Sequence, residues 1–189
     1  MNLISIFITS ILTENIILTK FLGICPFIGT SNKEKDALNM GVSVILVLTL
    51  SNIITYLLYH FLLVPTNTEY LETIIFILVI ASLVQLLIIM LKKYAPKIEE
   101  ALGIYLPLIT TNCAILGISL LSISNDYNFI ETIIYSLGSG IGFTLVIYIF
   151  ATIREKLNKN DIPKSFKGVP IALIVASIMA IVFSKFTIW

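Results

Sequence analysis

The sequence has few charged residues, only one histidine and only two cysteines. Of its 189 residues 12% are charged and 58% are hydrophobic, and the mean hydropathy is +1.02. Soluble domains are about a quarter charged, so this composition indicates an integral membrane protein. The single histidine, His60, excludes a His-rich metal site and a haem held by two histidines of this chain. The basic residues lie between apolar stretches, and we therefore expect no nucleic-acid partner.

Six apolar stretches are long enough to cross a bilayer. Crossing about 30 Å of hydrocarbon takes roughly 20 helical residues, so six spans with short connections use up the length. We expect the spans at residues 3–29, 38–61, 71–91, 101–123, 129–152 and 169–187. The sequence therefore predicts an all-α fold embedded in the lipid bilayer, with no soluble domain.

Lysine and arginine are found in alternate loops. Residues 31–39, 92–100 and 154–168 contain all the basic residues that lie between spans, whereas residues 62–70 and 124–128 contain none. Short basic loops stay on the cytoplasmic side of a membrane. We therefore expect these three loops inside and both termini outside, although Lys185 near the C-terminus argues weakly against this orientation.

The two halves of the chain, residues 1–95 and 96–189, resemble each other. The first and fourth spans each contain a polar interruption and the pattern Cys-x-x-x-Gly. Because each half has three spans, the halves would lie in the membrane in opposite orientations, as an inverted-topology repeat with broken helices 1 and 4. Cys25 and Cys113 would then be equivalent positions near the membrane midplane.

Each cysteine stands where its helix is expected to break. The residues that interrupt helical hydrogen bonding around them are Gly23, Pro26, Thr110, Thr111 and Asn112. Irregular backbone at membrane depth is tolerated only where protein or a cavity shields it, and half-helix N-termini stabilise negative charge such as that of a thiolate. These surroundings favour metal ligation, and the alternative is that each cysteine packs as a small hydrophobic residue.

Thiolate ligands suit zinc, copper(I) and iron–sulfur clusters. Zinc carries no electrons and has no evident task between membrane spans. Iron–sulfur clusters take about four protein ligands, and this chain has two thiols. If a cluster is present, the site must lie at an interface with a second, similar protein.

Glu14 is the carboxylate nearest to the first break. A carboxylate in the middle of a membrane helix costs about 2.5–3.5 kcal/mol, so such a group is shielded, paired or functional. Glu14 either caps a half-helix beside Asn15, reaches the membrane surface, or binds Na⁺ or H⁺ for ion coupling. For Asn52, Gln85 and Asn112 the expected role is hydrogen bonding between helices.

Several motifs resemble a known family. They are Phe21-Leu22-Gly23-Ile24-Cys25-Pro26-Phe27, the stretch from Leu102 to Ala114 that includes Thr110-Thr111-Asn112-Cys113, Ala151-Thr152-Ile153-Arg154-Glu155-Lys156-Leu157, and Asp161-Ile162-Pro163. The chain resembles the A subunit of the Rnf complex, an ion-translocating ferredoxin:NAD⁺ oxidoreductase. The E subunit of the sodium-pumping NADH:quinone reductase is a close relative in this family. The resemblance covers essentially the whole chain.

The resemblance implies six spans in two inverted halves and a paralogous partner of opposite topology, the Rnf E subunit. The family's two cysteines match Cys25 and Cys113, and two cysteines from each protein would hold one [2Fe-2S] cluster near the midplane. The cluster would pass electrons between an iron–sulfur subunit on the cytoplasmic side and a flavin subunit on the outer side, with the Rnf B, C, D and G subunits as further partners. Electron flow would be coupled to Na⁺ or H⁺ transport across a bacterial or archaeal plasma (inner) membrane.

Three other interpretations stay open. The chain could be the equivalent subunit of the NADH:quinone reductase, which shares most of these motifs. A small secondary transporter also has inverted repeats and broken helices, with a substrate at the midplane. A structural scaffold subunit would tolerate serine at both cysteine positions. In none of the redox readings do we expect activity from the isolated chain.

Overall fold

The computed structural model describes residues 3–31, 33–66, 69–94, 106–159, 163 and 166–187, and every element in these ranges is helical. The elements are α1 (Leu3–Ile11), α2 (Ile24–Thr30), α3 (Glu34–Leu58), the π-helical turn η1 (Tyr59–Leu63), α4 (Val64–Thr66), the 3₁₀ turn η2 (Glu69–Leu71), α5 (Glu72–Tyr94), α7 (Leu106–Thr110), α8 (Cys113–Ser124), α9 (Phe129–Asn158) and α10 (Val169–Thr187).

Three of these helices are long and apolar enough to cross a membrane. They are Glu34–Leu63, Glu72–Met90 and Phe129–Asn158, with mean hydropathies of 2.0, 2.9 and 1.9. Two shorter apolar helices cover Leu108–Ser124 and Val169–Ser184. At 1.5 Å per residue the 30-residue helices extend about 45 Å, more than the hydrocarbon thickness. The prediction of an all-helical membrane protein is thus confirmed, while the six spans and the inverted repeat stay predictions.

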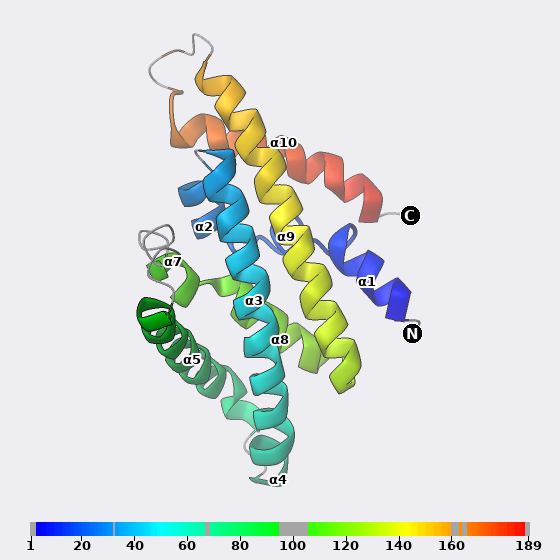
Figure 1. Cartoon of the computed structure of the whole chain (residues 1–189). Helices are drawn as coiled ribbons and strands as arrows, with labels where there is room; N and C mark the ends of the chain where they lie inside the picture. Colours follow the sequence, from blue (N-terminus) through cyan, green and yellow to red (C-terminus); the bar gives the residue numbers. More distant parts are fainter. Residues whose placement is uncertain are drawn as a thin grey trace.

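Helices α3 and α9 form the centre of the molecule and lie side by side in opposite directions (Figure 1). Their close approach depends on glycine. A Cβ atom at Gly41 would collide with the side chain of Thr144, and one at Gly140 would lie 2.9 Å from Cγ1 of Ile45. Small residues at such crossings bring backbones together, and this close packing drives the association of membrane helices.

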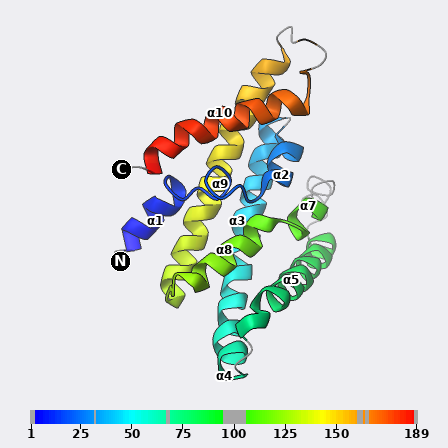
Figure 2. The same ribbon diagram turned by 180° about the vertical axis from the view of Figure 1, so that it is seen from behind.

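The other elements surround this pair. Helix α1 packs on α9, where a Cβ at Gly142 would lie 2.9 Å from the carbonyl oxygen of Ile11. Residues 12–23 cross α9 at mid-height to reach α2, and α10 crosses α9 above them (Figure 2). Helix α8 packs on α3 below that crossing, and α5 lies beside α3 with most of its side chains exposed.

The sequence predicted the position of the second helix break more accurately than that of the first. The break in residues 101–123 is confirmed where it was expected, because α7 ends at Thr110 and α8 begins at Cys113; residues 101–105 lie outside the described residues. The first break was expected near Cys25, but the irregular segment is longer and comes earlier, from residue 12 to residue 23. Within it Phe21 and Gly23 have positive φ angles of 55° and 82°, which no helix accommodates.

The helix that contains the fifth predicted span is longer than the span itself. Helix α9 continues to Asn158, six residues beyond the predicted boundary at residue 152. Arg154, which was expected in the basic loop, is therefore a helical residue and is only 8% exposed. The extension keeps Arg154 on the inner side of α9, where it reaches α2.

Candidate metal centre

One hydrogen bond joins the two breaks. The backbone N–H of Gly23 donates to Sγ of Cys113 at 2.9 Å, across 90 residues of sequence. An N–H donor stabilises negative charge on a sulfur atom more than it stabilises the neutral thiol. The two irregular segments are therefore in direct contact, at Gly23 and Cys113.

Gly23 occupies a position that disfavours any side chain. Its φ of 82° is in the left-handed region, and a Cβ atom there would lie 3.1 Å from Cβ of Ala114 and 3.1 Å from Cε2 of Phe143. Both the backbone conformation and the crowding favour glycine. This conformation directs the amide of Gly23 at Cys113.

Asn112 starts α8 by capping it. Its backbone is extended, and its side-chain Oδ1 accepts a hydrogen bond of 3.1 Å from the N–H of Ala114. Asparagine is a preferred residue for this role. The cap makes Cys113 the first residue of a 12-residue helix, where the partial positive charge of the helix N-terminus favours a thiolate.

Cys25 is the second residue of α2, and its side chain is exposed, while Cys113 is partly exposed. Both are free thiols. Pro26 is buried beside Cys25, and its carbonyl oxygen accepts a bond of 2.7 Å from Oγ1 of Thr30. No group of three or more metal-ligating side chains occurs among the described residues.

Helix α2 is attached to α9 at two points. The rings of Phe27 and Phe150 stack with centroids 4.1 Å apart. Nη1 of Arg154 donates to the carbonyl oxygen of Ile28 at 2.7 Å and to Oγ of Ser31 at 2.8 Å. The arginine therefore satisfies a carbonyl group near the C-terminus of α2, where helices leave such groups without partners.

Sequence reasoning missed the role of Arg154. It treated this residue as one of the loop charges that set orientation. A usable signal was present, since Arg154 is the only arginine in the chain and all other basic residues except His60 are lysines. Arginine is the cation best suited to buried sites, because its guanidinium group is weakly hydrated and donates in fixed directions.

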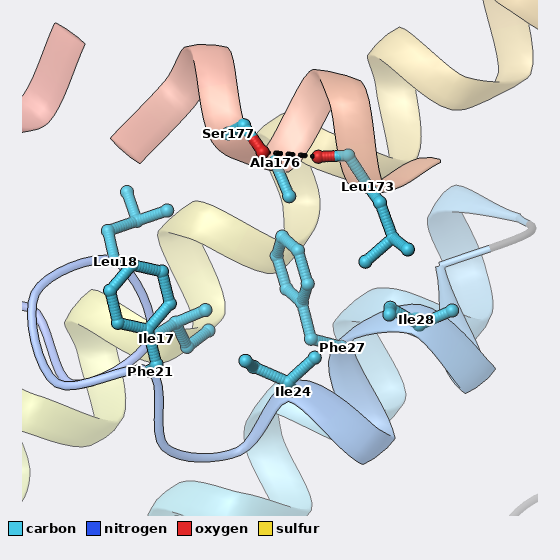
Figure 3. A pocket seen from close by; sticks show the side chains of 9 residues that line it. All are labelled: Ile17, Leu18, Phe21, Ile24, Phe27, Ile28, Leu173, Ala176 and Ser177. Atoms are coloured by element: carbon cyan, nitrogen blue, oxygen red, sulfur yellow. Dashed lines mark hydrogen bonds between the residues drawn. The ribbon is translucent and has the colours of Figure 1, made fainter. Parts of the chain in front are cut away.

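An apolar pocket of about 100 Å³ lies beside α2, between it and α10 (Figure 3). Its lining residues are Ile17, Leu18, Phe21, Ile24, Phe27, Ile28, Leu173, Ala176 and Ser177. The hydroxyl group of Ser177 donates to its own helix, at the carbonyl oxygen of Leu173. The pocket therefore offers no charge or thiol, and it is separate from the sulfur atoms.

The remaining predicted site residues, Thr110, Thr111 and Glu14, lie in different environments. Thr110 ends α7 and is partly buried, and Thr111 is exposed in the turn before Asn112. Burial, Glu14 and Glu131, in that order, raise the pKa of the Tyr127 phenol. Glu14 directly precedes Asn15, whose Nδ2 would lie 3.0 Å from a Cβ atom at Gly142, in the middle of α9. Glu14 therefore belongs to the segment that crosses α9.

Comparisons with known proteins identify the family of this chain. A family profile described as "Rnf-Nqr subunit, membrane protein" matches residues 3–189. A protein from Acetobacterium woodii, named as the A subunit of a Na(+)-translocating ferredoxin:NAD(+) oxidoreductase complex, is 51% identical over 187 residues. The match covers 99% of this chain and 97% of that one.

Two further relatives are named as the A subunit of an ion-translocating oxidoreductase complex. The one from Aeromonas hydrophila is 48% identical over 94% of this chain and 92% of its own length. The one from Vibrio vulnificus is 45% identical over 97% of this chain and 96% of its own length. Because the profile and these relatives cover nearly the whole chain, the protein belongs to the Rnf-Nqr family of membrane subunits.

Proposed function

We propose that the protein is the electron-transfer membrane subunit of an ion-translocating ferredoxin:NAD⁺ oxidoreductase of the Rnf type, in which Cys25 and Cys113 supply two of the four ligands of a shared [2Fe-2S] cluster. The observation that carries the proposal is the hydrogen bond from Gly23 to Sγ of Cys113 at the capped start of α8. The names of the relatives support membership of such a complex.

The residues present fit an iron–sulfur cluster. Cluster ligands are thiolates, and N–H donors to the sulfur atoms, net charge and solvent exposure set the reduction potential. Here Cys113 has a backbone donor and a helix N-terminus, both of which stabilise negative charge. When bound, the cluster would accept one electron and release it again. Gly23 and Asn112 would hold the sulfur of Cys113 in place during both steps.

The incomplete ligand set implies a partner. Two sulfur atoms cannot complete a four-ligand site, and the exposed side chain of Cys25 is open to another chain. A paralogous protein with two equivalent cysteines, the Rnf E subunit, would complete the site. The [2Fe-2S] cluster would then lie between the two proteins, and the B, C, D and G subunits would carry electrons to and from it.

Ion coupling is a further part of the proposal. Glu14, a half-buried carboxylate, is our candidate for a group that binds Na⁺ or H⁺ during turnover. Replacing it by glutamine should then impair ion transport more than electron transfer. The equivalent subunit of the NADH:quinone reductase has the same requirements at the cysteines, so it is the second candidate.

The test is the cluster content of the purified complex. Iron, acid-labile sulfide and the reduced-state EPR spectrum should be measured for wild type and for Cys25→Ser and Cys113→Ser. We expect each variant to lose one [2Fe-2S] signal while the complex stays assembled. The control is Ser124→Ala at the far end of α8, which removes an exposed polar atom and should leave the spectrum unchanged.

The outcome separates this function from its rivals. An unchanged cluster inventory in both cysteine variants would return the two residues to ordinary packing and favour a transporter or scaffold. Loss of the signal, together with assembly of the whole complex, would identify the chain as an electron carrier. The choice of electron acceptor, NAD⁺ or quinone, would follow from the activity of the same preparation.

A further inference from the structure

A group of buried polar side chains lies between α3, α8 and α9, away from the cysteines. Its members are Ser51, Asn52 and Thr55 on α3, Ser119 and Ser122 on α8, and Thr132 and Ser136 on α9, all at most 3% exposed. None of these residues is charged. The group is buried between helices of which two, α3 and α9, are long and apolar enough to cross a membrane, and each uncompensated buried polar atom is costly.

Most hydroxyl groups in these helices are satisfied by their own backbone. Thr55 donates to the carbonyl oxygen of Ser51, Ser119 to that of Ile115, and Ser136 to that of Thr132. Two hydroxyls of the group differ, because Oγ of Ser51 and Oγ1 of Thr132 are buried and have no hydrogen-bond partner. Their oxygen atoms are therefore available to a ligand.

Asn52 contributes a third unpartnered oxygen. Its Nδ2 donates to the carbonyl oxygen of Leu48 at 2.9 Å, whereas Oδ1, on the other side of the amide carbon, has no partner. The residue is only 1% exposed. Leaving a buried acceptor unpaired is costly, so a ligand at this position would relieve that penalty.

The register of the helices brings these atoms to one level. The rings of Tyr56 and Phe129 are 5.5 Å apart, and Gly140 packs on Ile45. Tyr56 follows Ile45 by 11 residues on α3, and Gly140 follows Phe129 by 11 residues on the antiparallel α9. The register is therefore the same at both contacts, and it places Asn52 level with residue 133, next to Thr132. Oγ1 of Thr55 lies 3.5 Å from Oγ of Ser119, which brings α8 to the same level.

We propose that Ser51, Asn52 and Thr132 form a binding site for a monovalent cation, with Na⁺ as the probe ion. The inference rests on the proposed function, since an ion-translocating subunit needs a place for its ion between the two sides of the membrane. Ser119, which approaches Thr55 on α3, is six residues after Cys113, about 9 Å along α8, so the site is distinct from the cysteines.

The chemistry of the donors favours a small, hard, singly charged ion. Hydroxyl and amide oxygens are hard ligands, and neutral oxygens alone can replace the hydration shell of a monovalent cation. Divalent ions are usually bound with carboxylates. The carboxylate nearest in sequence, Glu131, is engaged elsewhere, since its Oε2 accepts from the N–H of Asn128 in the helix cap of α9.

The experiment uses the assembled complex and two isosteric variants of the same helix. Thr132→Val removes one unpartnered hydroxyl. Thr144→Val is the matched control, because Oγ1 of Thr144 already donates to the carbonyl oxygen of Gly140. The thermal unfolding midpoint is measured in NaCl and in choline chloride, and the Na⁺ dependence of turnover is measured in parallel, with Ser51→Ala as a second test of the site.

We expect NaCl to raise the midpoint of wild type and of Thr144→Val. For Thr132→Val and Ser51→Ala, the Na⁺ concentration that gives half of the effect should rise about tenfold, as the loss of roughly 1.4 kcal/mol of binding free energy requires. Equal Na⁺ dependence in Thr132→Val and Thr144→Val would overturn the site, and so would a wild-type midpoint that is the same in both salts. If a buried water occupied the site instead of Na⁺, the wild-type midpoint would be the same in both salts.

The Na⁺ dependence of the thermal midpoint is measured independently of the cluster content. All four proteins should retain the [2Fe-2S] signal, because the hydrogen bond to Cys113 comes from Gly23 and involves none of the substituted residues. A complex with its cluster but without Na⁺-dependent stability would therefore refute the cation site alone. Loss of the proposed function would instead be seen in the spectra of the cysteine variants.

Discussion

Gly23 is the residue on which the geometry of the centre depends most closely. Its positive φ angle and the nearby atoms of Ala114 and Phe143 each disfavour a side chain. Its amide is also the donor to Sγ of Cys113. A change at this position therefore affects the backbone conformation, the packing of α8 and the charge on the sulfur atom together.

We predict that Gly23→Ala destabilises the complex and weakens the cluster site. The left-handed conformation alone costs a non-glycine residue about 1–2 kcal/mol, and the contacts at 3.1 Å add to this. The measurements are the thermal midpoint of the purified complex and the amount and shape of its reduced EPR signal. We expect a lower midpoint and a reduced or altered signal.

Gly168→Ala provides the control. Gly168 has a φ of 96°, but no atom lies within 4 Å of the position where its Cβ would be. This variant shares the backbone strain and lacks the crowding and the bond to sulfur. If the two variants had the same midpoint and the same EPR signal, the local role assigned to Gly23 would be wrong.

At the scale of whole elements, the short helix α2 is the piece that presents Cys25. It has seven residues, too few to be stable alone. The stack of Phe27 on Phe150 and the bonds from Arg154 fix it against α9. Arg154 is thus a positioning residue for Cys25, acting through the C-terminal end of α2.

We predict that Arg154→Met releases α2 and lowers both the thermal midpoint and the cluster content of the complex. The substitution removes the donor to the hydroxyl of Ser31 and leaves the carbonyl oxygen of Ile28 with only the longer bond of 3.4 Å from Oγ of Ser31, and losing a buried hydrogen-bond partner costs about 1–3 kcal/mol. Lys156→Met removes an exposed charge two residues further along α9 and should have little effect. Equal effects of the two substitutions would mean that only the loss of positive charge matters.

The breaks show what the sequence predicted and what it did not. Thr110-Thr111-Asn112 before Cys113 predicted the α7–α8 break correctly, because the cap that ends one helix and starts the next is a local feature. The segment before α2 was placed too late, since its shape depends on Gly23 meeting Ala114 and Phe143, which are distant in sequence. The anchoring by Arg154 was missed for the same reason, as its acceptors lie more than 120 residues earlier.

For the molecule as a whole, the loop charges predict an orientation in the membrane. The arrangement of helices is consistent with several crossings, since α3 and α9 lie side by side in opposite directions (Figure 1). Lysines cluster near the start of α3 and at the end of α9, which are at the same end of the molecule. Both should therefore face the cytoplasm.

We predict that both termini lie outside the cytoplasm. Alkaline phosphatase, which is active only outside, should be active when fused after Trp189 and inactive when fused after Asn158. Green fluorescent protein should give the opposite pattern at the same two positions, and this serves as the control for expression. Fluorescence after Trp189 together with phosphatase activity after Asn158 would reverse the predicted orientation.

The bond between Gly23 and Cys113 also has a consequence for how the protein is made. The first break cannot adopt its final form until residue 113 has been synthesised, 90 residues later. At about 5–20 residues per second, the N-terminal half spends roughly 5–20 s inside the membrane before the Gly23 amide has its partner. In a chain truncated before α8 this irregular segment would stay unshielded in lipid. Quality-control proteases of the membrane would then recognise the chain as incompletely folded.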